Sequence, residues 1–363
     1  MTTTFTPRPL PALEAARAHR APAERLRELR RAALTARDAI LGEGAVTGLA
    51  TCPIVTFPYS TSFAFSGAAL SPAPYVMLTN RMQVVQFVGT DGAPKTLLFN
   101  PTDALAGQSA RFFSALRQRY GSFLSDRVMS TYHGTVQGHL ERLGLAPAEV
   151  DYIAFDHLHV QDVRGWLGTA ERPAFFPRAK MLVQRAEWEA TRDLHPFSAP
   201  WYVADGTAGI PDARVELLDG DAWLGRGVAL VKTQGHTHGN QSLAVSTGEA
   251  LYVCSENGVA VETYTPLASH IPGLRRYAEH LGYEVVLNGN TREGSMDQYT
   301  SMILEKTLAG PSRADAAFCN FIPSSELTAS LLAPGLAPTF SHGEVSHGAL
   351  RSVLRTSGGP RTA

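Results

Sequence analysis

The sequence predicts an α/β fold in which two mixed β-sheets lie between layers of helices. Three observations lead to this prediction: strand-like apolar runs occur in two groups, helical patterns separate the groups, and another helical pattern precedes the first. Of the 363 residues, 44% are hydrophobic and 18% are charged. This composition is ordinary for a globular protein and provides enough apolar surface for a sizeable core.

A helical pattern over residues 10–42 opens the chain and ends at Gly42. The runs that then predict strands are PIVTFPYSTSFAF, YVMLTNRMQVVQFV and KTLLFN, and the Asp-Gly turn between the last two predicts a hairpin. Residues 103–143 predict helices, including ARFFSALRQRYG and VMSTYHGTVQGHLERLG. The run LAPAEVDYIAF after them leads into a short strand.

The second half repeats this rhythm. Strands are predicted by AKMLVQ, ARVELL, VALVKT and ALYVCS, and helices by IPGLRRYAEHLG and QYTSMILEKTLAG. The run EVVLNGN, which follows the first of these helices, predicts another strand. The residues from about 311 onward are rich in Pro, Gly and Ser, and we expect them to wrap over the body of the protein.

The composition excludes several classes of partner. A net charge of −1 gives no general attraction to nucleic acid or to an anionic membrane. The sequence shows neither a secretory h-region nor an apolar stretch of membrane-spanning length, and its three cysteines are too far apart for a CxxC pair. We therefore expect a cytoplasmic protein that acts on a small molecule. The apolar face of residues 10–42 is expected to cover a sheet, with a homodimer contact as the alternative.

Histidines at the end of one predicted strand indicate a metal site. His157 and His159 alternate by two, so an extended backbone points both imidazoles to one side. The pair alone is weak evidence, because two buried, hydrogen-bonded histidines would give the same pattern. His236, in TQGHTHGN after another strand, supplies a third imidazole, as in catalytic zinc sites that leave a fourth position to water. Glu256 follows a further strand in LYVCSENG, where a carboxylate is either functional or a solvated turn residue.

The order of these pieces resembles the metallo-β-lactamase superfamily, especially its lactonase-like branch of small-molecule hydrolases. The motifs that carry the resemblance are DHLHVQD, TQGHTHGN, ALYVCSENG and LGYEVVLNGN, and it extends over about residues 70–305. The resemblance implies an αββα sandwich. It also implies an N-terminal helical extension at 1–50, a catalytic domain at 51–310 and a C-terminal extension at 311–363.

This sequence departs from the family pattern at every position of the second metal site. Gln161 stands at the usual Asp and Asp162 at the usual His. Glu256 replaces the bridging Asp, and Asn290 replaces the late His. Since neutral amides are poor ligands for a dication, the resemblance implies a single ion, bound by the three histidines. Glu256 is then a fourth ligand or a supporting group, and a second ion held by Asp162 is the alternative.

The resemblance implies hydrolysis of a small ester, lactone or amide by a metal-activated water, with zinc as the expected ion. Asp162 or Glu256 would act as general base. A mononuclear non-haem iron or manganese oxygenase on the same fold is a second hypothesis, and a non-catalytic ligand-binding protein is a third.

Other residues near the motifs have two interpretations each. His238 is expected to line the pocket or to support a ligand, and Asp156 either orients an imidazole or caps a turn. His342 and His347 either supply a late ligand or lie in a polar loop, and His270 and His280 are expected to be structural or exposed. Aromatic residues near the motif loops either shape an apolar pocket or pack in the core; these are Trp166, Trp188, Trp201 and Tyr264.

Overall fold

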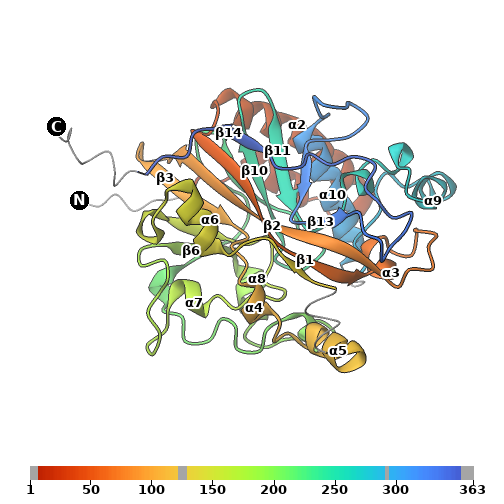
Figure 1. Cartoon of the computed structure of the whole chain (residues 1–363). Helices are drawn as coiled ribbons and strands as arrows, with labels where there is room; N and C mark the ends of the chain where they lie inside the picture. Colours follow the sequence, from red (N-terminus) through yellow and green to blue (C-terminus); the bar gives the residue numbers. More distant parts are fainter. Residues whose placement is uncertain (1–6, 122–128, 291–293, 353–363) are drawn as a thin grey trace, which may run out of the picture.

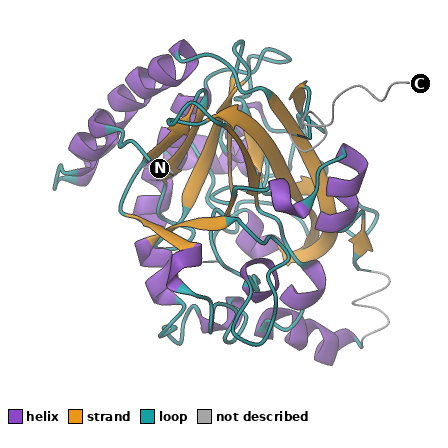
Figure 2. Cartoon of the chain, turned by 90° about the vertical axis from the view of Figure 1, so that its left-hand side faces the viewer, coloured by secondary structure: helices purple, strands orange, loops and turns teal. Residues whose placement is uncertain are grey.

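The computed structural model describes residues 7–121, 129–290 and 294–352. Two mixed β-sheets pack face to face, and helices cover both outer faces (Figure 1; Figure 2). The predicted αββα sandwich is therefore confirmed. None of the described helices is long and apolar enough to cross a membrane.

The larger sheet has the strand order β14-β1-β2-β3-β5-β6-β7, and β4 and β13 pair with β1 and β2 beside this path. Its strands are β1 (Gly48–Ser60), β2 (Tyr75–Val88), β3 (Pro94–Phe99), β4 (Thr131–Tyr132), β5 (Tyr152–Ala154), β6 (Lys180–Gln184), β7 (Val215–Leu218), β13 (Ser325–Thr328) and β14 (Ser346–Gly348). The strands β3, β5, β6 and β7 run parallel, whereas β1, β2 and β3 are antiparallel neighbours.

The smaller sheet has the order β12-β11-β10-β9-β8. It consists of β8 (Ala222–Gly225), β9 (Val228–Lys232), β10 (Gln241–Ser246), β11 (Leu251–Ser255) and β12 (Phe321–Pro323). The pair β11 and β12 is parallel, and the other pairs are antiparallel. Apolar side chains from both sheets, such as Phe99 and Leu230, meet between them in one buried cluster.

The helices are α1 (Pro11–Arg17), α2 (Pro22–Gly42), α3 (Thr61–Ala64), α4 (Ala104–Gly107), α5 (Arg111–Tyr120), α6 (Val136–Leu143), α7 (Arg164–Leu167), α8 (Arg185–Ala190), α9 (Leu274–Leu281) and α10 (Ser295–Ala309). Residues of α1, α2 and α10 pack on the smaller sheet, and residues of α6 and α8 pack on the larger one. On α2, Leu29 and Ala33 are buried in this contact, whereas Leu34 is half exposed. The apolar face of α2 therefore covers a sheet, and the homodimer contact stays a prediction.

Three predictions of secondary structure are wrong. The strand expected to continue through residues 61–65 ends at Ser60, and α3 follows because Ala64 and Phe65 turn into an apolar cluster. The helix expected from Val128, which lies outside the described residues, begins at Val136 after the short strand β4.

The run EVVLNGN, at residues 284–290, forms a loop in place of the expected strand. Two of its backbone N–H groups bond to helical segments and not to a strand: Val286 donates to the Thr263 carbonyl and Gly289 donates to the Phe63 carbonyl of α3. The residues after 310 supply β12 to the smaller sheet and β13 and β14 to the larger one. The division into three parts at residues 50 and 310 stays a prediction.

Candidate metal centre

Two loops that carry histidines meet where strands of both sheets end. His157 and His159 follow β5 of the larger sheet, and His236 lies between β9 and β10 of the smaller sheet. The backbone N–H of Gln241, the first residue of β10, donates to the Asp156 carbonyl at 2.9 Å. This bond joins the two sheets at the point where the histidine-bearing loops leave them.

The three predicted histidines converge. Their ring centroids are 4.7 Å apart for His157 and His159, 4.4 Å for His157 and His236, and 5.1 Å for His159 and His236. One nitrogen from each ring lies within 4.8 Å of one nitrogen of the others, a spacing that could hold a metal ion. All three side chains are buried.

Asp156 fixes the orientation of the first imidazole. Its Oδ1 atom lies 2.9 Å from His157 Nδ1 and also accepts the His157 backbone N–H at 2.9 Å. Its Oδ2 atom accepts a bond from Ser324 Oγ. With Nδ1 directed to a carboxylate, Nε2 of His157 is the nitrogen available to a metal, an arrangement common among metal-bound histidines.

The histidine cluster has the properties expected of an ion-binding site. Nε2 of His159 is buried, and no described residue forms a hydrogen bond with it. Burial and the neighbouring His157 and His236 lower the pKa of His159 well below its usual value, which favours the neutral ring that binds metals. Burial acts to lower the pKa of His157 too, but the carboxylates of Asp156, Glu256 and Glu187 raise it to about 9.

Glu256 lies beside the same cluster. Its carboxylate, the carboxylate of Asp156 and a nitrogen of His157 lie within 4.8 Å of one another. Ser325 Oγ, on β13, donates to Glu256 Oε2 at 2.9 Å. Burial acts to raise the pKa of Glu256, His157 opposes the shift and Asp156 adds to it, and the net result is a pKa of about 7.

Asp162 is not brought into this cluster. Its carboxylate accepts two bonds from the Arg164 side chain, at 2.9 and 2.6 Å, and one from the Arg164 backbone N–H at 3.1 Å. Burial acts to raise the pKa of Asp162, but Arg164 brings it below its usual value. The carboxylate is therefore held in a local ion pair, away from the imidazoles.

Two side-chain amides stand where the family pattern has ligands of the second metal site, and both line the cavity. They belong to Gln161 and Asn290, and Gln161 Nε2 donates to Thr102 Oγ1 at 3.2 Å. The expectation that His238 lines the pocket or supports a ligand is wrong. It sits in a turn of the 235–239 loop and is exposed to solvent. Residues two apart, such as His236 and His238, point to the same side only on an extended backbone, and a turn does not provide one.

The remaining candidates lie elsewhere. His342 bonds to the Cys319 carbonyl at 3.0 Å, and His347 is paired with Leu49 through β14. His270 and His280 are exposed, as expected. Among the aromatic residues considered from the sequence, Trp201 lines the cavity, whereas Trp166, Trp188 and Tyr264 pack in apolar clusters.

Two buried glutamates that the sequence did not single out support the loops. Glu187 on α8 accepts bonds from the Leu158 backbone N–H and from the hydroxyls of Tyr202 and Thr237. Glu305 on α10 accepts bonds from Asn257 Nδ2 and from hydroxyls of Ser242, Ser255 and Tyr264. Asn257 in turn accepts the His236 backbone N–H at 3.1 Å.

The charges around the cluster favour a cation. Four carboxylates surround the histidine-bearing loops, namely Asp156, Glu187, Glu256 and Glu305. No Lys or Arg among the described residues forms an ion pair with any of them. Buried carboxylates are stable when a counter-charge compensates them. Three imidazoles among carboxylates that no described Lys or Arg neutralises therefore fit a bound divalent cation.

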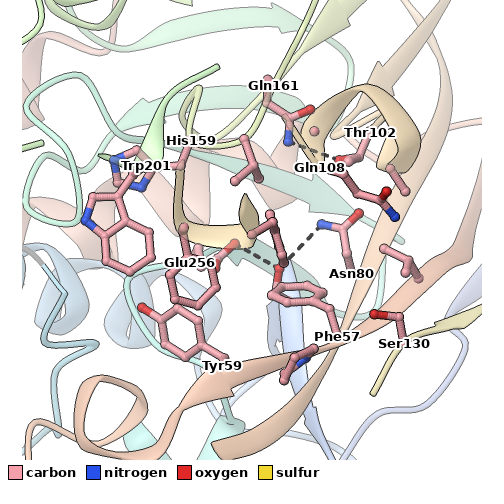
Figure 3. Close-up of a pocket in the computed structure, with 18 of the residues that line it drawn as sticks. Phe57, Tyr59, Asn80, Thr102, Gln108, Ser130, His159, Gln161, Trp201 and Glu256 are labelled. Atoms are coloured by element: carbon pink, nitrogen blue, oxygen red, sulfur yellow. Dashed lines mark hydrogen bonds between the residues drawn. The ribbon is translucent and has the colours of Figure 1, made fainter. Parts of the chain in front are cut away.

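The cavity next to the cluster has a volume of about 90 Å³, and aromatic residues form part of its wall. Phe112 of α5 stacks on Trp201 with ring centroids 4.8 Å apart, and Phe113 meets Phe57 edge-on at 5.9 Å. Figure 3 shows Trp201, Tyr59 and His159 on one side of the cavity and Gln108 and Ser130 on the other. The chemistry of the site thus lies beside a surface suited to apolar groups.

The comparisons with known proteins agree with the sequence motifs. No family model matches the chain. An N-acyl homoserine lactonase from a Bacillus species is 29% identical over 129 residues, which are 35% of this chain and 46% of that protein. The lactonase AttM of Rhizobium radiobacter is 30% identical over 116 residues, which are 29% of this chain and 40% of that protein. The chain is similar to N-acyl homoserine lactonases.

This similarity confirms the resemblance that the motifs indicate, although the chain spans less than half the length of these two lactonases. Two solved structures also align with it. AidC, a dizinc quorum-quenching lactonase, aligns with a TM-score of 0.49 and 12% identity, over 84% of this chain and 94% of that one. AbOPH, a hydrolase in the beta lactamase superfamily, gives a TM-score of 0.47 and 14% identity, over 84% and 94%.

Proposed function

We propose that the protein is a metal-dependent hydrolase of a lactone, or of a related small ester or amide, with one zinc ion bound by the three histidines. The observation that carries this proposal is the convergence of three buried imidazoles in one cavity, beside carboxylates that no described Lys or Arg neutralises. The similarity to N-acyl homoserine lactonases supports a lactone as the substrate class.

A zinc ion at this position would lower the pKa of a bound water and polarise a substrate carbonyl. Asp156 keeps Nδ1 of His157 engaged, so that Nε2 is directed into the cluster. Glu256 lies beside His157 and is the group we assign as general base. Asp162 was the other candidate for this role, and its ion pair with Arg164 favours Glu256.

A single ion is supported by the side chains around the cluster. Where the family pattern has ligands of the second metal, Gln161 and Asn290 present neutral amides to the cavity. The carboxylate of Asp162 is paired with Arg164, which disfavours its use as a ligand for a second ion there. A second ion would have to rely on Asp156 and Glu256, and these carboxylates already accept bonds from Ser324 and Ser325. We therefore propose that zinc binds with a stoichiometry of one.

The test combines elemental analysis with a hydrolysis assay. The protein purified without added metal should contain about one zinc per chain and should open a lactone ring in a panel of lactones, esters and amides. Two ions per chain would contradict the mononuclear site. Iron with oxygen consumption would favour the oxygenase, and a metal-loaded protein without turnover on the panel would favour a ligand-binding role.

A further inference from the structure

Glu187 has a position that neither the motifs nor the proposed chemistry explains. It lies on α8, outside the cavity lining, and its side chain is only 1% exposed. We propose that Glu187 is a positioning residue that holds both histidine-bearing loops in the geometry that binds the ion. This inference rests on the metal-dependent function proposed above, and it concerns the affinity and geometry of the site.

One carboxylate oxygen fixes the first loop. Oε1 of Glu187 accepts the backbone N–H of Leu158, the residue between His157 and His159, at 2.8 Å. The same atom accepts the Tyr202 hydroxyl at 2.9 Å. Tyr202 is bridged to His159 through the backbone, and their rings lie 4.7 Å apart. Oε1 therefore holds the backbone between His157 and His159, and it also holds Tyr202, which contacts His159.

The other oxygen fixes the second loop. Oε2 accepts the hydroxyl of Thr237, the residue after His236, at 2.6 Å. The loop also packs directly on α8, because a Cβ atom at Gly239 would lie 2.2 Å from the Glu187 backbone nitrogen. One carboxylate thus ties together two loops that come from different sheets and are separated by more than seventy residues.

Glu187 also contributes its charge. No described Lys or Arg pairs with this carboxylate, and its hydrogen-bond donors are an N–H and two neutral hydroxyls. The negative charge therefore remains to act on the histidine cluster nearby, where it favours a bound cation. Partners that orient metal ligands in this indirect way commonly change metal affinity by about 10–100-fold when they are removed.

The experiment compares zinc affinity in five forms of the full chain: wild type, Glu187→Ala, Glu187→Gln, Tyr202→Phe and Glu262→Gln. The last is a matched control, since Glu262 is a fully buried glutamate bonded to the Thr339 backbone N–H and lies outside the cavity lining. Zinc affinity is measured by competition with a chromogenic chelator. The absorption spectrum of the cobalt-substituted protein reports the coordination geometry, and circular dichroism and thermal unfolding of the metal-free protein report folding.

Glu187→Ala removes the bonds and the charge, and it should weaken zinc binding about 10–100-fold and alter the cobalt spectrum. Glu187→Gln removes the charge but keeps one acceptor oxygen, so its effect should be smaller. Glu262→Gln should bind zinc as the wild type does, even where its melting temperature falls. Tyr202→Phe, which removes one bond to Glu187, should weaken binding less than Glu187→Ala.

Wild-type zinc affinity and an unchanged cobalt spectrum in folded Glu187→Ala would overturn the proposal. If that variant does not fold, wild-type affinity in both Glu187→Gln and Tyr202→Phe would overturn it. A loss of affinity in Glu262→Gln equal to that in Glu187→Ala would also overturn it, because the effect would then be one of general stability. Failure of the proposed function looks different: the wild type itself would bind no metal, or would bind it without hydrolysing any substrate.

Discussion

The two ends of the cavity are built by different forces. At the histidine end, buried hydrogen bonds fix the direction of each group: Asp156 holds His157, and Glu187 holds the loops on either side. At the aromatic end, the wall consists of rings that contact one another, such as Phe112 stacked on Trp201. Hydrogen bonds restrict direction as well as distance, whereas ring contacts mainly restrict volume.

This difference suggests how the two ends divide their tasks. Metal ligands and a general base require positions accurate to a fraction of an ångström, which a network of hydrogen bonds provides. An apolar wall discriminates more weakly, by the size and apolar surface of the group that it accepts. We therefore expect changes at the histidine end to act on metal binding and kcat, and changes at the aromatic end to act on KM.

The largest effect is expected from His159→Ala. Without this imidazole, the site retains two histidines, and both bound zinc and activity should be lost, with a fall in kcat/KM on the order of 10³-fold or more because the reaction depends on the ion. Elemental analysis and initial rates test this expectation. Activity at the wild-type level in a variant that has lost its zinc would show that the histidine end is not the reaction centre.

Glu256→Gln is expected to have little effect on zinc binding but a large effect on kcat. The amide cannot accept a proton, so kcat should fall by about 10²–10⁴-fold, the range typical of a lost general base. The zinc content should stay near one ion per chain. A variant that loses zinc in proportion to activity would instead identify Glu256 as a ligand.

At the aromatic end, Phe112→Ala should raise KM by about tenfold for substrates with long or aromatic acyl groups, since the variant loses an apolar contact in the wall. The effect on kcat and on zinc content should be small. Steady-state kinetics with a short-chain and a long-chain lactone separate the two quantities. An equal rise in KM for both substrates would contradict a role of this wall in choosing the acyl group.

The smallest effect on activity is expected from a buried ion pair outside the cavity. Arg17 of α1 donates to both carboxylate oxygens of Asp221, at 2.6 and 2.7 Å. Arg17→Ala leaves a buried carboxylate without its partner and should reduce the free energy of unfolding by about 3 kcal/mol. Chemical denaturation measures this loss, while kcat/KM at 25 °C should stay within about twofold of the wild type. A large fall in activity would mean that α1 influences the cavity.

Sequence patterns could predict the parts of the structure that depend on local periodicity. The run Tyr75–Val88 was predicted as a strand and forms one with those bounds, since its apolar residues suit a strand buried on both faces. The histidine pair is similar: on an extended segment, His157 and His159 point the same way and meet His236. The same spacing fails for His236 and His238, because their loop is a turn.

Features that depend on distant contacts could not be predicted in this way. Glu187 lies in RAEWEA, which has the pattern of an ordinary helix, and its role appears only when Leu158 and Thr237 come to it from two other loops. The strands β12, β13 and β14 are three or four residues long and exist because longer strands pair with them.

The two serines at the junction of β12 and β13 have a consequence for how the protein is made. Ser324 and Ser325 support Asp156 and Glu256, which lie far earlier in the chain. The ribosome must therefore synthesise the chain as far as Ser325 before the hydrogen bonds around the histidine cluster can be completed. The histidines are synthesised before the serines that complete the site. We therefore expect the metal to bind in the last stage of folding, so that its uptake depends on chaperones and on the metal available at that stage.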